Sequence, residues 1–428
     1  MPCARPQTLQ RCYSQSNMQV NVGFAFNASY EVAAAGLLAS SISYTQVEAS
    51  VTAPSGPLDD FAVAPSIPWT TASASTISGF SATCWFSAKS LVAARSGTHN
   101  DIRLGLISAP WGGTSIKVHA PLAVNTSCGA LYPGGDAGCG EDHAPCQAST
   151  LYNSMQAPIH GPRGFPVSAM LWFQGENDAL SLPPPSLSSP FPWYSCMLQG
   201  LVPALRSVYA SPQSTWVTIQ LAPYSGGAVL APFRKMQCDA TALIPNASCV
   251  VLADDGDITS PIGSVHSRNK QLVGRRVGAV LASSLYGVPL PTRGGAGPTF
   301  QSAQFIGTGG TSTLSAIVSF DVATLGPRGL IPTPPSTSPW SNATRCATDN
   351  GLIKVSGCGW FEILGSDGVA YNTSAALFND SAVAITAQGV PISTKPIGVA
   401  WGWNEWPVNE FANEFGYPIV PFYFNATA

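Results

Sequence analysis

Short apolar runs alternate with helical patterns through the first two-thirds of the chain. Largely apolar or β-branched runs, typical of strands buried on both faces of a sheet, lie at residues 102–108, 167–173, 216–221 and 249–253. Segments with helical spacing of apolar positions lie at residues 29–40, 82–94, 193–209 and 268–286. Strands that alternate with helices predict a parallel sheet covered by helices on both faces, an α/β fold of three layers.

The pattern changes at about residue 289. Residues 313–322, 351–364 and 382–390 are predicted strands bounded by Gly, Pro or Asn, and no long amphipathic helix is visible there. We therefore expect a large α/β domain over residues 1–288 and a smaller β-rich domain over residues 289–428. A length of 428 residues suits this division.

Charge and hydropathy exclude some function classes. Charged residues make up 10% of the chain, the formal net charge is −3, and no basic run occurs. Nothing in this composition would attract nucleic acid or an anionic membrane surface. No apolar stretch reaches the roughly 20 residues that a spanning helix needs, so we expect no membrane span.

Cysteines and glycosylation sequons favour the secretory route. The chain has 11 cysteines and none in a metal-type C-x-x-C pair, so we expect disulfides, with buried free thiols as the alternative. Secretion or a lysosomal location follows, although residues 1–10 contain no apolar signal region, which we interpret as a truncated N-terminus. Asn-x-Ser/Thr sequons, the acceptors of N-glycosylation, begin at Asn27, Asn125, Asn246, Asn342, Asn372, Asn379 and Asn425.

Three segments carry candidate groups for acyl transfer. Ser-Gln-Ser-Asn-Met at residues 14–18 precedes a helical segment, where a serine hydroxyl is exposed and backbone N–H groups can hold an oxyanion; the alternative is a simple turn. The strand at residues 102–108 runs towards Gly112 and Gly113, whose backbone can approach a substrate closely. The strand at residues 167–173 ends at Gln174 and Asn177, whose amides can donate to an oxyanion; Asn177 could equally cap a helix.

A fourth segment combines acidic residues with a histidine. Asp254 and Asp257 follow the predicted strand at residues 249–253, and His266 precedes the last helix of the domain. A serine–histidine pair oriented by a carboxylate is the usual arrangement for acyl transfer. The acidic cluster could instead bind Ca²⁺, although its spacing is not that of an EF-hand loop.

Taken together in this order, the four segments resemble the sequence blocks of sialate O-acetylesterases, which are carbohydrate esterases of the SGNH superfamily. The blocks are Ser-Gln-Ser-Asn-Met (14–18), Ser-Ala-Pro-Trp-Gly-Gly-Thr (108–114), Trp-Phe-Gln-Gly-Glu-Asn-Asp (172–178) and Ser-Pro-Ile-Gly-Ser-Val-His-Ser-Arg-Asn-Lys-Gln (260–271). The resemblance extends to Ala-Trp-Gly-Trp-Asn-Glu-Trp-Pro at residues 400–407 and to residues 418–422. It therefore implies an SGNH-hydrolase-like three-layer α/β/α domain with a parallel sheet.

The resemblance also implies roles for the candidate residues. Ser16 matches the nucleophile and His266 the general base, while Asp254 or Asp257 would orient the histidine. The backbone N–H groups of Ser16 and of Gly113, or alternatively Gly112, would hold the oxyanion. Gln174 is the first candidate for a side-chain donor and Asn177 the second. Such a mechanism needs no metal and no organic cofactor.

The chain departs from the family pattern near these residues. The family usually has Gly where Ser14 stands, Pro where Ser267 stands and often Trp where His119 stands. Many relatives carry an aspartate at the position of Gly263 or Ser264, so the acid must come from upstream or the enzyme works with a Ser–His dyad. The segment before the nucleophile, Gln-Thr-Leu-Gln-Arg-Cys-Tyr, is polar where the family has an apolar strand, and we expect a weak first strand.

The resemblance implies a serine esterase that removes O-acetyl groups from sialic acids. Two rivals remain open: an esterase for another acetylated glycan such as acetylxylan, and an inactive SGNH-like protein that only binds glycans. In each case the expected partner is an acetylated sugar or glycan. The sequence gives no indication of the oligomeric state.

Overall fold

In the computed structural model, the chain forms two compact units. The first unit comprises Met1–Leu221, Met236–Val250 and His266–Pro289, and the second comprises Ala222–Lys235, Val251–Val265 and Leu290–Ala428. The units therefore interleave along the sequence. The structure describes residues 8–48, 54–95, 102–132, 147–156, 166–181, 191–224, 230–306, 312–333, 361–403, 405–407 and 409–426.

A seven-stranded sheet with the order β3-β2-β4-β1-β5-β6-β7 forms the first unit's centre. All neighbouring strands run parallel except the β2–β3 pair at one edge, which is antiparallel. This sheet confirms the predicted α/β class. Its strands are β1 (Thr8–Ser14), β2 (Ile42–Gln46), β3 (Ile67–Thr71), β4 (Leu104–Pro110), β5 (Val167–Phe173), β6 (Thr215–Ile219) and β7 (Ala247–Val250).

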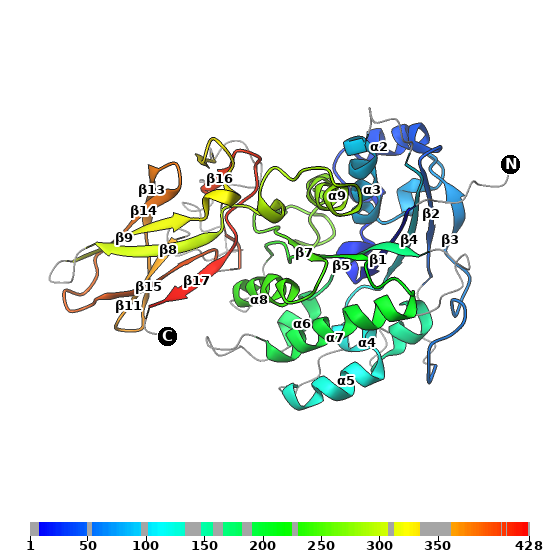
Figure 1. Cartoon of the computed structure of the whole chain (residues 1–428), viewed down its shortest axis with the longest axis horizontal. Coiled ribbons are helices and arrows are strands. Elements are labelled where there is room, and N and C mark those ends of the chain that lie inside the picture. Colours follow the sequence, from blue (N-terminus) through cyan, green and yellow to red (C-terminus); the bar gives the residue numbers. More distant parts are fainter. Residues whose placement is uncertain are drawn as a thin grey trace. The chain divides into compact units, whose positions relative to one another are not determined.

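Helices cover both faces of this sheet. Figure 1 shows α3 and α9 side by side on one face and α7 on the other. The helices are α1 (Ser16–Gln19), α2 (Ala28–Ala34), α3 (Ala82–Arg95), α4 (Ile116–His119), α5 (Leu122–Cys128), α6 (Glu176–Ser181), α7 (Pro192–Val208), α8 (Leu230–Ala242) and α9 (Lys270–Tyr286). Shorter turns are η1 (Val22–Phe24), η2 (Ala35–Leu38), η3 (Ile77–Gly79), η4 (Gly129–Leu131), η5 (Tyr152–Gln156), η6 (Arg293–Gly295) and η7 (Val322–Thr324).

Strand β1 is where the sequence prediction was wrong. It is not weak: it lies between β4 and β5, and all of its residues are buried. Some of its polar side chains have partners from distant parts of the chain: Gln10 Nε2 donates to the sulfur of Cys84 (3.8 Å), and the Arg11 guanidinium lies 4.6 Å from the centre of the Tyr209 ring. Such contacts favour burial of polar side chains that a local pattern scores as unfavourable.

Strand β7 is shorter than predicted. It ends at Val250 rather than at residue 253, because its neighbour β6 ends at Ile219 and the ladder closes with the bond from the Gln220 N–H to the Val250 carbonyl (2.9 Å). Asp254 therefore lies in a turn beyond the sheet edge instead of directly after a strand.

The second unit is rich in β-strands, as predicted, and these strands pair in antiparallel sheets. Their orders are β12-β11-β15-β17, β13-β14-β9-β8 and β10-β16. Aromatic side chains fill the interior, with Phe361, Trp401 and Phe422 buried close to one another. The strands are β8 (Phe300–Ile306), β9 (Thr313–Phe320), β10 (Leu330–Pro332), β11 (Phe361–Gly365), β12 (Ala370–Asn372), β13 (Ser374–Asn379), β14 (Ala382–Gln388), β15 (Pro396–Trp401), β16 (Phe411–Asn413) and β17 (Phe422–Asn425).

Every cysteine in the described part of the chain is disulfide-bonded, which confirms the expectation of disulfides. The bonds join Cys12 to Cys84, Cys128 to Cys196 and Cys238 to Cys249. Cys3, Cys139, Cys146, Cys346 and Cys358 lie outside the described residues.

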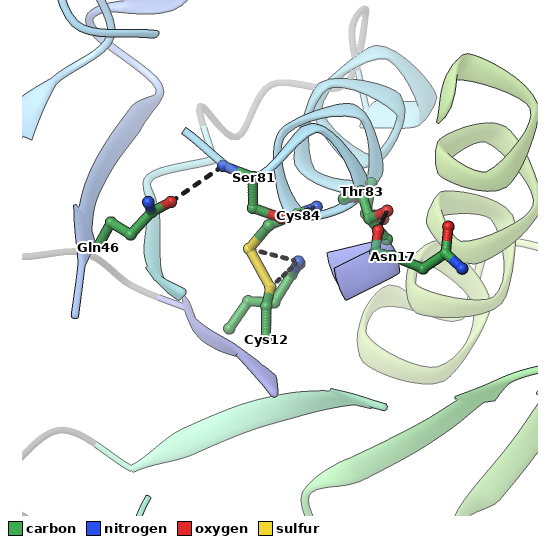
Figure 2. Close-up of a disulfide and its surroundings, with 8 residues drawn as sticks. Cys12, Asn17, Gln46, Ser81, Thr83 and Cys84 are labelled. Atoms are coloured by element: carbon green, nitrogen blue, oxygen red, sulfur yellow. Dashed lines mark hydrogen bonds between the residues drawn. A yellow bond between two sulfur atoms is a disulfide. The ribbon is translucent and has the colours of Figure 1, made fainter. Parts of the chain in front are cut away.

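The Cys12–Cys84 bond ties the central strand to helix α3 (Figure 2). Beside it, the Thr83 hydroxyl donates to the Asn17 carbonyl (3.2 Å). The turn that follows β1 is thus fixed to the same helix as the strand itself.

Candidate active site

Ser16 lies at the carboxyl end of the central strand. Strand β1 ends at Ser14, and Ser16 is the first residue of α1, half-buried between buried neighbours Gln15 and Asn17. A ligand of a parallel sheet binds beyond the carboxyl ends of the strands, so Ser16 stands where a substrate would enter.

The backbone at Ser14 shows why glycine suits this position, where the chain departs from the family pattern. Its φ is +149°, a backbone conformation that favours glycine, and its side chain is fully buried. The Ser14 hydroxyl has no hydrogen-bond partner in the described part of the chain. A glycine here would avoid both costs, so the serine is tolerated rather than required by the turn.

The Gly112–Gly113 turn lies against Ser16. A Cβ atom added to Gly112 would be 3.4 Å from the Ser16 Cβ, and the Gly112 N–H donates to Gln19 Oε1 (2.9 Å). Gly113 has a φ of +66°, and its carbonyl accepts from Asn177 Nδ2 (2.9 Å). The Gly112 N–H is therefore engaged, and the assignment of the Gly113 N–H as an oxyanion donor stays a prediction.

One carboxylate holds both residues that flank Ser16. Glu176, at the start of α6, accepts from Gln15 Nε2 and from Asn17 Nδ2 (2.5 Å), and it is almost fully buried. Burial raises the pKa of the Glu176 carboxyl, while the bonds from Asn17 and Gln15 and the nearby Lys270 charge oppose that rise. The turn that carries Ser16 is therefore fixed on both sides by a single group.

Lys270 connects this turn to the chain around His266. The buried Lys270 ammonium donates to Asn17 Oδ1 (2.8 Å) and lies 5.0 Å from the centre of the Phe173 ring. Lys270 begins α9 and comes shortly after His266, which is half-buried. The bond therefore brings the beginning of α9 to the residue next to Ser16, on the sheet edge where a base would be needed.

Gln174 and Asn177 differ in how their amide hydrogens are used. Gln174 is fully buried, and its Nε2 donates to the Thr114 carbonyl (2.9 Å) and to Asp178 Oδ2 (2.5 Å), which uses both hydrogens. Asn177 is half-buried and donates one hydrogen to Gly113. Gln174 thus uses both amide hydrogens, whereas Asn177 keeps one, and the assignment of either as the side-chain oxyanion donor stays a prediction.

Asp178 anchors the chain that follows the glycine turn. It accepts from Ser115 Oγ (2.5 Å) and from the Ile116 N–H (3.0 Å), and so caps α4 from a distant part of the sequence. Burial outweighs these donors and raises the pKa of Asp178 to about 6.

Asp254 and Asp257 belong to the second unit, whereas His266 belongs to the first. The loop between the two aspartates packs within its own unit, where a Cβ on Gly256 would lie 2.4 Å from the Trp406 ring. A larger residue than glycine would therefore displace Trp406 or the loop. The assignment of either aspartate as the orienting acid stays a prediction.

The calcium alternative gains no support from the described residues. They contain no group of three or more His, Cys, Asp or Glu side chains arranged to hold a metal ion.

In the same part of the chain, no helix is both long and apolar enough to cross a membrane.

The structure thus assembles Ser16, Gly112, Gly113 and Asn177 at one edge and places Gln174 beneath them. Sequence reasoning missed the buried groups that fix this edge, Glu176 and Lys270. Both lie inside the blocks that resemble the family, but nothing in their local pattern separates a buried anchor from a solvated charge.

A three-layer α/β/α fold with a serine turn at the end of its central strand is the architecture of a hydrolase-like domain. The sequence model described as carbohydrate esterase, sialic acid-specific acetylesterase, matches residues 13–285. The chain belongs to this family.

Curated relatives are similar to this chain in sequence, and one solved structure is similar to it in fold. The chain is 24% identical over 336 residues to sialate O-acetylesterase of Rattus norvegicus and 25% identical over 307 residues to that of Homo sapiens. Each match covers 64% of this chain but only 56% and 53% of the relative, so the chain spans about half the length of these relatives. A carbohydrate acetylesterase from Xanthomonas citri shares the fold, with a TM-score of 0.72 at 22% identity over 98% of this chain and 80% of that one.

Proposed function

We propose that this protein is a carbohydrate O-acetylesterase that removes O-acetyl groups from sialic acids through an acetyl-enzyme on Ser16. The observation that carries the proposal is the position of Ser16 at the end of the central strand, with the Gly112–Gly113 turn against it. Family membership over residues 13–285 supports the same chemistry.

The reaction would proceed in two steps. His266 takes the proton of the Ser16 hydroxyl while the oxygen attacks the acetyl carbonyl, and then returns that proton to the departing sugar oxygen. In the second step His266 takes a proton from water while the water oxygen attacks the acetyl group, and it then gives that proton to the departing Ser16 oxygen, which releases acetate and restores the Ser16 hydroxyl. Either Asp254 or Asp257 would orient the imidazole, or else the enzyme would work as a dyad.

Three donors would stabilise the oxyanion of each tetrahedral intermediate. These are the N–H groups of Ser16 and Gly113 and the remaining amide hydrogen of Asn177. Removing one such donor typically lowers kcat by about 10²–10³-fold. Asn177→Ala should show at least that loss, because it removes the remaining donor and also the bond that holds the Gly113 carbonyl, whereas Gln174→Ala should mainly destabilise the protein because it leaves fully buried groups without partners.

Two other functions share the same sequence blocks. An esterase for acetylxylan would use the same nucleophile, and an inactive relative would bind acetylated glycans without turnover. The disulfides and sequons support the secretory pathway as the place of action.

The deciding experiment compares initial rates on O-acetylated sialic acid and on acetylxylan for the parent protein and Ser16→Ala. We expect faster release of acetate from the sialic acid and at least about a 10³-fold loss in the variant. Faster release from xylan would replace the substrate, and no release from either would favour the binding protein.

A further inference from the structure

A buried histidine lies beneath the glycine turn. His119 ends the short helix α4, and its side chain is fully buried with its ring 5.3 Å from the centre of Trp172. The mechanism proposed above does not use this residue. Burial lowers the pKa of His119 to about 3, so the imidazole is neutral at physiological pH and its two nitrogens have different roles.

Hydrogen bonds around the ring run in one direction. Gln156 Nε2 contacts His119 Nδ1, and because an amide nitrogen only donates, Nδ1 is the acceptor. The ring proton is therefore on Nε2, which lies 2.8 Å from Thr114 Oγ1. The Thr114 hydroxyl donates its hydrogen to the Trp111 carbonyl (2.7 Å), so its oxygen accepts from the histidine.

This chain of bonds ends on the peptide that precedes the glycines. The Trp111 carbonyl is held from below by Thr114, and the Trp111 N–H donates to the Ser14 carbonyl (2.8 Å). On the other side, Asn177 holds the Gly113 carbonyl. The peptide that carries the Gly113 N–H thus lies between two fixed peptides, and its direction depends on both.

We propose that His119 is a positioning residue, which acts through Thr114 to hold the Gly113 N–H towards the oxyanion. This inference rests on the proposed function. His119 does not touch the substrate. Its Nε2–H donates to the Thr114 oxygen, and this bond keeps the Thr114 hydroxyl hydrogen directed at the Trp111 carbonyl. Without that donor the Thr114 hydroxyl can rotate away and release the turn.

Two pairs of variants separate positioning from packing. His119→Phe keeps a ring but removes both hydrogen bonds, while His119→Gln can accept from Gln156 and donate to Thr114 as the imidazole does. Thr114→Val removes the hydroxyl, and Thr114→Ser restores it. Val118→Ala is the matched control, since Val118 is equally buried on the same short helix but lies outside the chain of bonds.

Kinetics are measured with p-nitrophenyl acetate. Displacement of a reacting group by about 1 Å can cost roughly 10²-fold, so we expect His119→Phe and Thr114→Val to lower kcat by about 10–100-fold with KM changed by less than about threefold. His119→Gln and Thr114→Ser should recover to within about fivefold of the parent, and Val118→Ala should keep its kcat. Parent-like kcat in His119→Phe, or equal losses in the Phe and Gln variants, would overturn the proposal.

A spectroscopic readout does not depend on activity. Long-range ¹H–¹⁵N spectra of the parent labelled at its five histidines are recorded near about pH 5, where a histidine of ordinary pKa is protonated; the His119 ring should remain neutral there with its proton on Nε2. A proton on Nδ1 of His119 would overturn the proposal even if His119→Phe fails to fold. If the parent hydrolyses no acetyl ester, the proposed function fails and the role of His119 with it, whereas the same spectra still report whether the chain of bonds exists.

Discussion

Acid stability offers a quantitative test of the buried His119. In the unfolded chain its pKa takes the ordinary value of 6.5, whereas burial lowers the folded value to about 3 and the bond from Gln156 only partly opposes this. A lowered folded pKa means that the unfolded chain binds the proton more tightly. The stability that neutral His119 allows is therefore present above about pH 6.5 and is lost as the pH falls towards 3.

The size of the effect follows from the two pKa values. Between about pH 7 and pH 5 the protonation of the unfolded chain should lower the free energy of unfolding by about 2 kcal/mol. Asp178 works in the opposite sense, because its pKa rises from 3.8 to about 6 on folding. Acidification over the same interval should raise the free energy of unfolding by about 1 kcal/mol through Asp178, so the pH dependence of the parent protein alone does not isolate the histidine.

The difference between the parent and His119→Gln isolates the histidine. Denaturant-dependent hydrogen exchange at the amides of β4 and α4 measures the opening free energy of the first unit at each pH. The parent should lose about 2 kcal/mol relative to His119→Gln between about pH 7 and pH 5, since the Asp178 contribution cancels. A difference that stays constant to within about 0.5 kcal/mol over this interval would refute a buried, neutral His119.

Three further predictions concern the turn and the sequons. Ser14→Gly should raise the free energy of unfolding by about 1 kcal/mol over Ser14→Ala in urea unfolding, because only glycine relieves the positive φ; equal stabilities would contradict the strain. Glu176→Gln should lower kcat by at least about tenfold on p-nitrophenyl acetate, because the new amide nitrogen would face either Gln15 Nε2 or Asn17 Nδ2, which are both donors. An unchanged kcat would show that Glu176 does not position the turn that carries Ser16. In protein from a secretory host, glycopeptide mass spectrometry should find glycans at the exposed Asn246 and Asn379 but not at Asn125, whose amide nitrogen donates to the carbonyls of Lys117 and Ala120; a glycan at Asn125 would contradict this.

Elements with a continuous apolar pattern could be predicted from the sequence. Helix α9 begins within two residues of its predicted start, and β5 has the predicted bounds, because each buries an apolar face that its own residues display. Helix α8 was missed since Arg234 and Gln237 interrupt its apolar pattern while both side chains are buried. Arg234 is satisfied by the Ala222 and Glu405 carbonyls, partners that no local window contains.

The candidate site could be predicted only as a set of positions. Sequence blocks gave Ser16 and the glycines, and the structure brings these together at one sheet edge. They did not indicate that the two amide hydrogens of Gln174 are used while Asn177 keeps one, because that depends on tertiary partners. The sequence did not indicate that Asp178 caps α4, because that helix lies more than 60 residues earlier in the chain.

The central claim is that Ser16 carries the acetyl group during turnover. The most direct measurement is peptide mapping by mass spectrometry after the protein is mixed with O-acetylated sialic acid and quenched in acid within the first turnovers. We expect an acetyl group on Ser16 in the parent and none in Ser16→Ala. If His266→Ala still acylates, it should accumulate more of the acetyl-enzyme than the parent. Turnover of the sugar without an acetyl group on Ser16, or with the group on another serine such as Ser14, would contradict it.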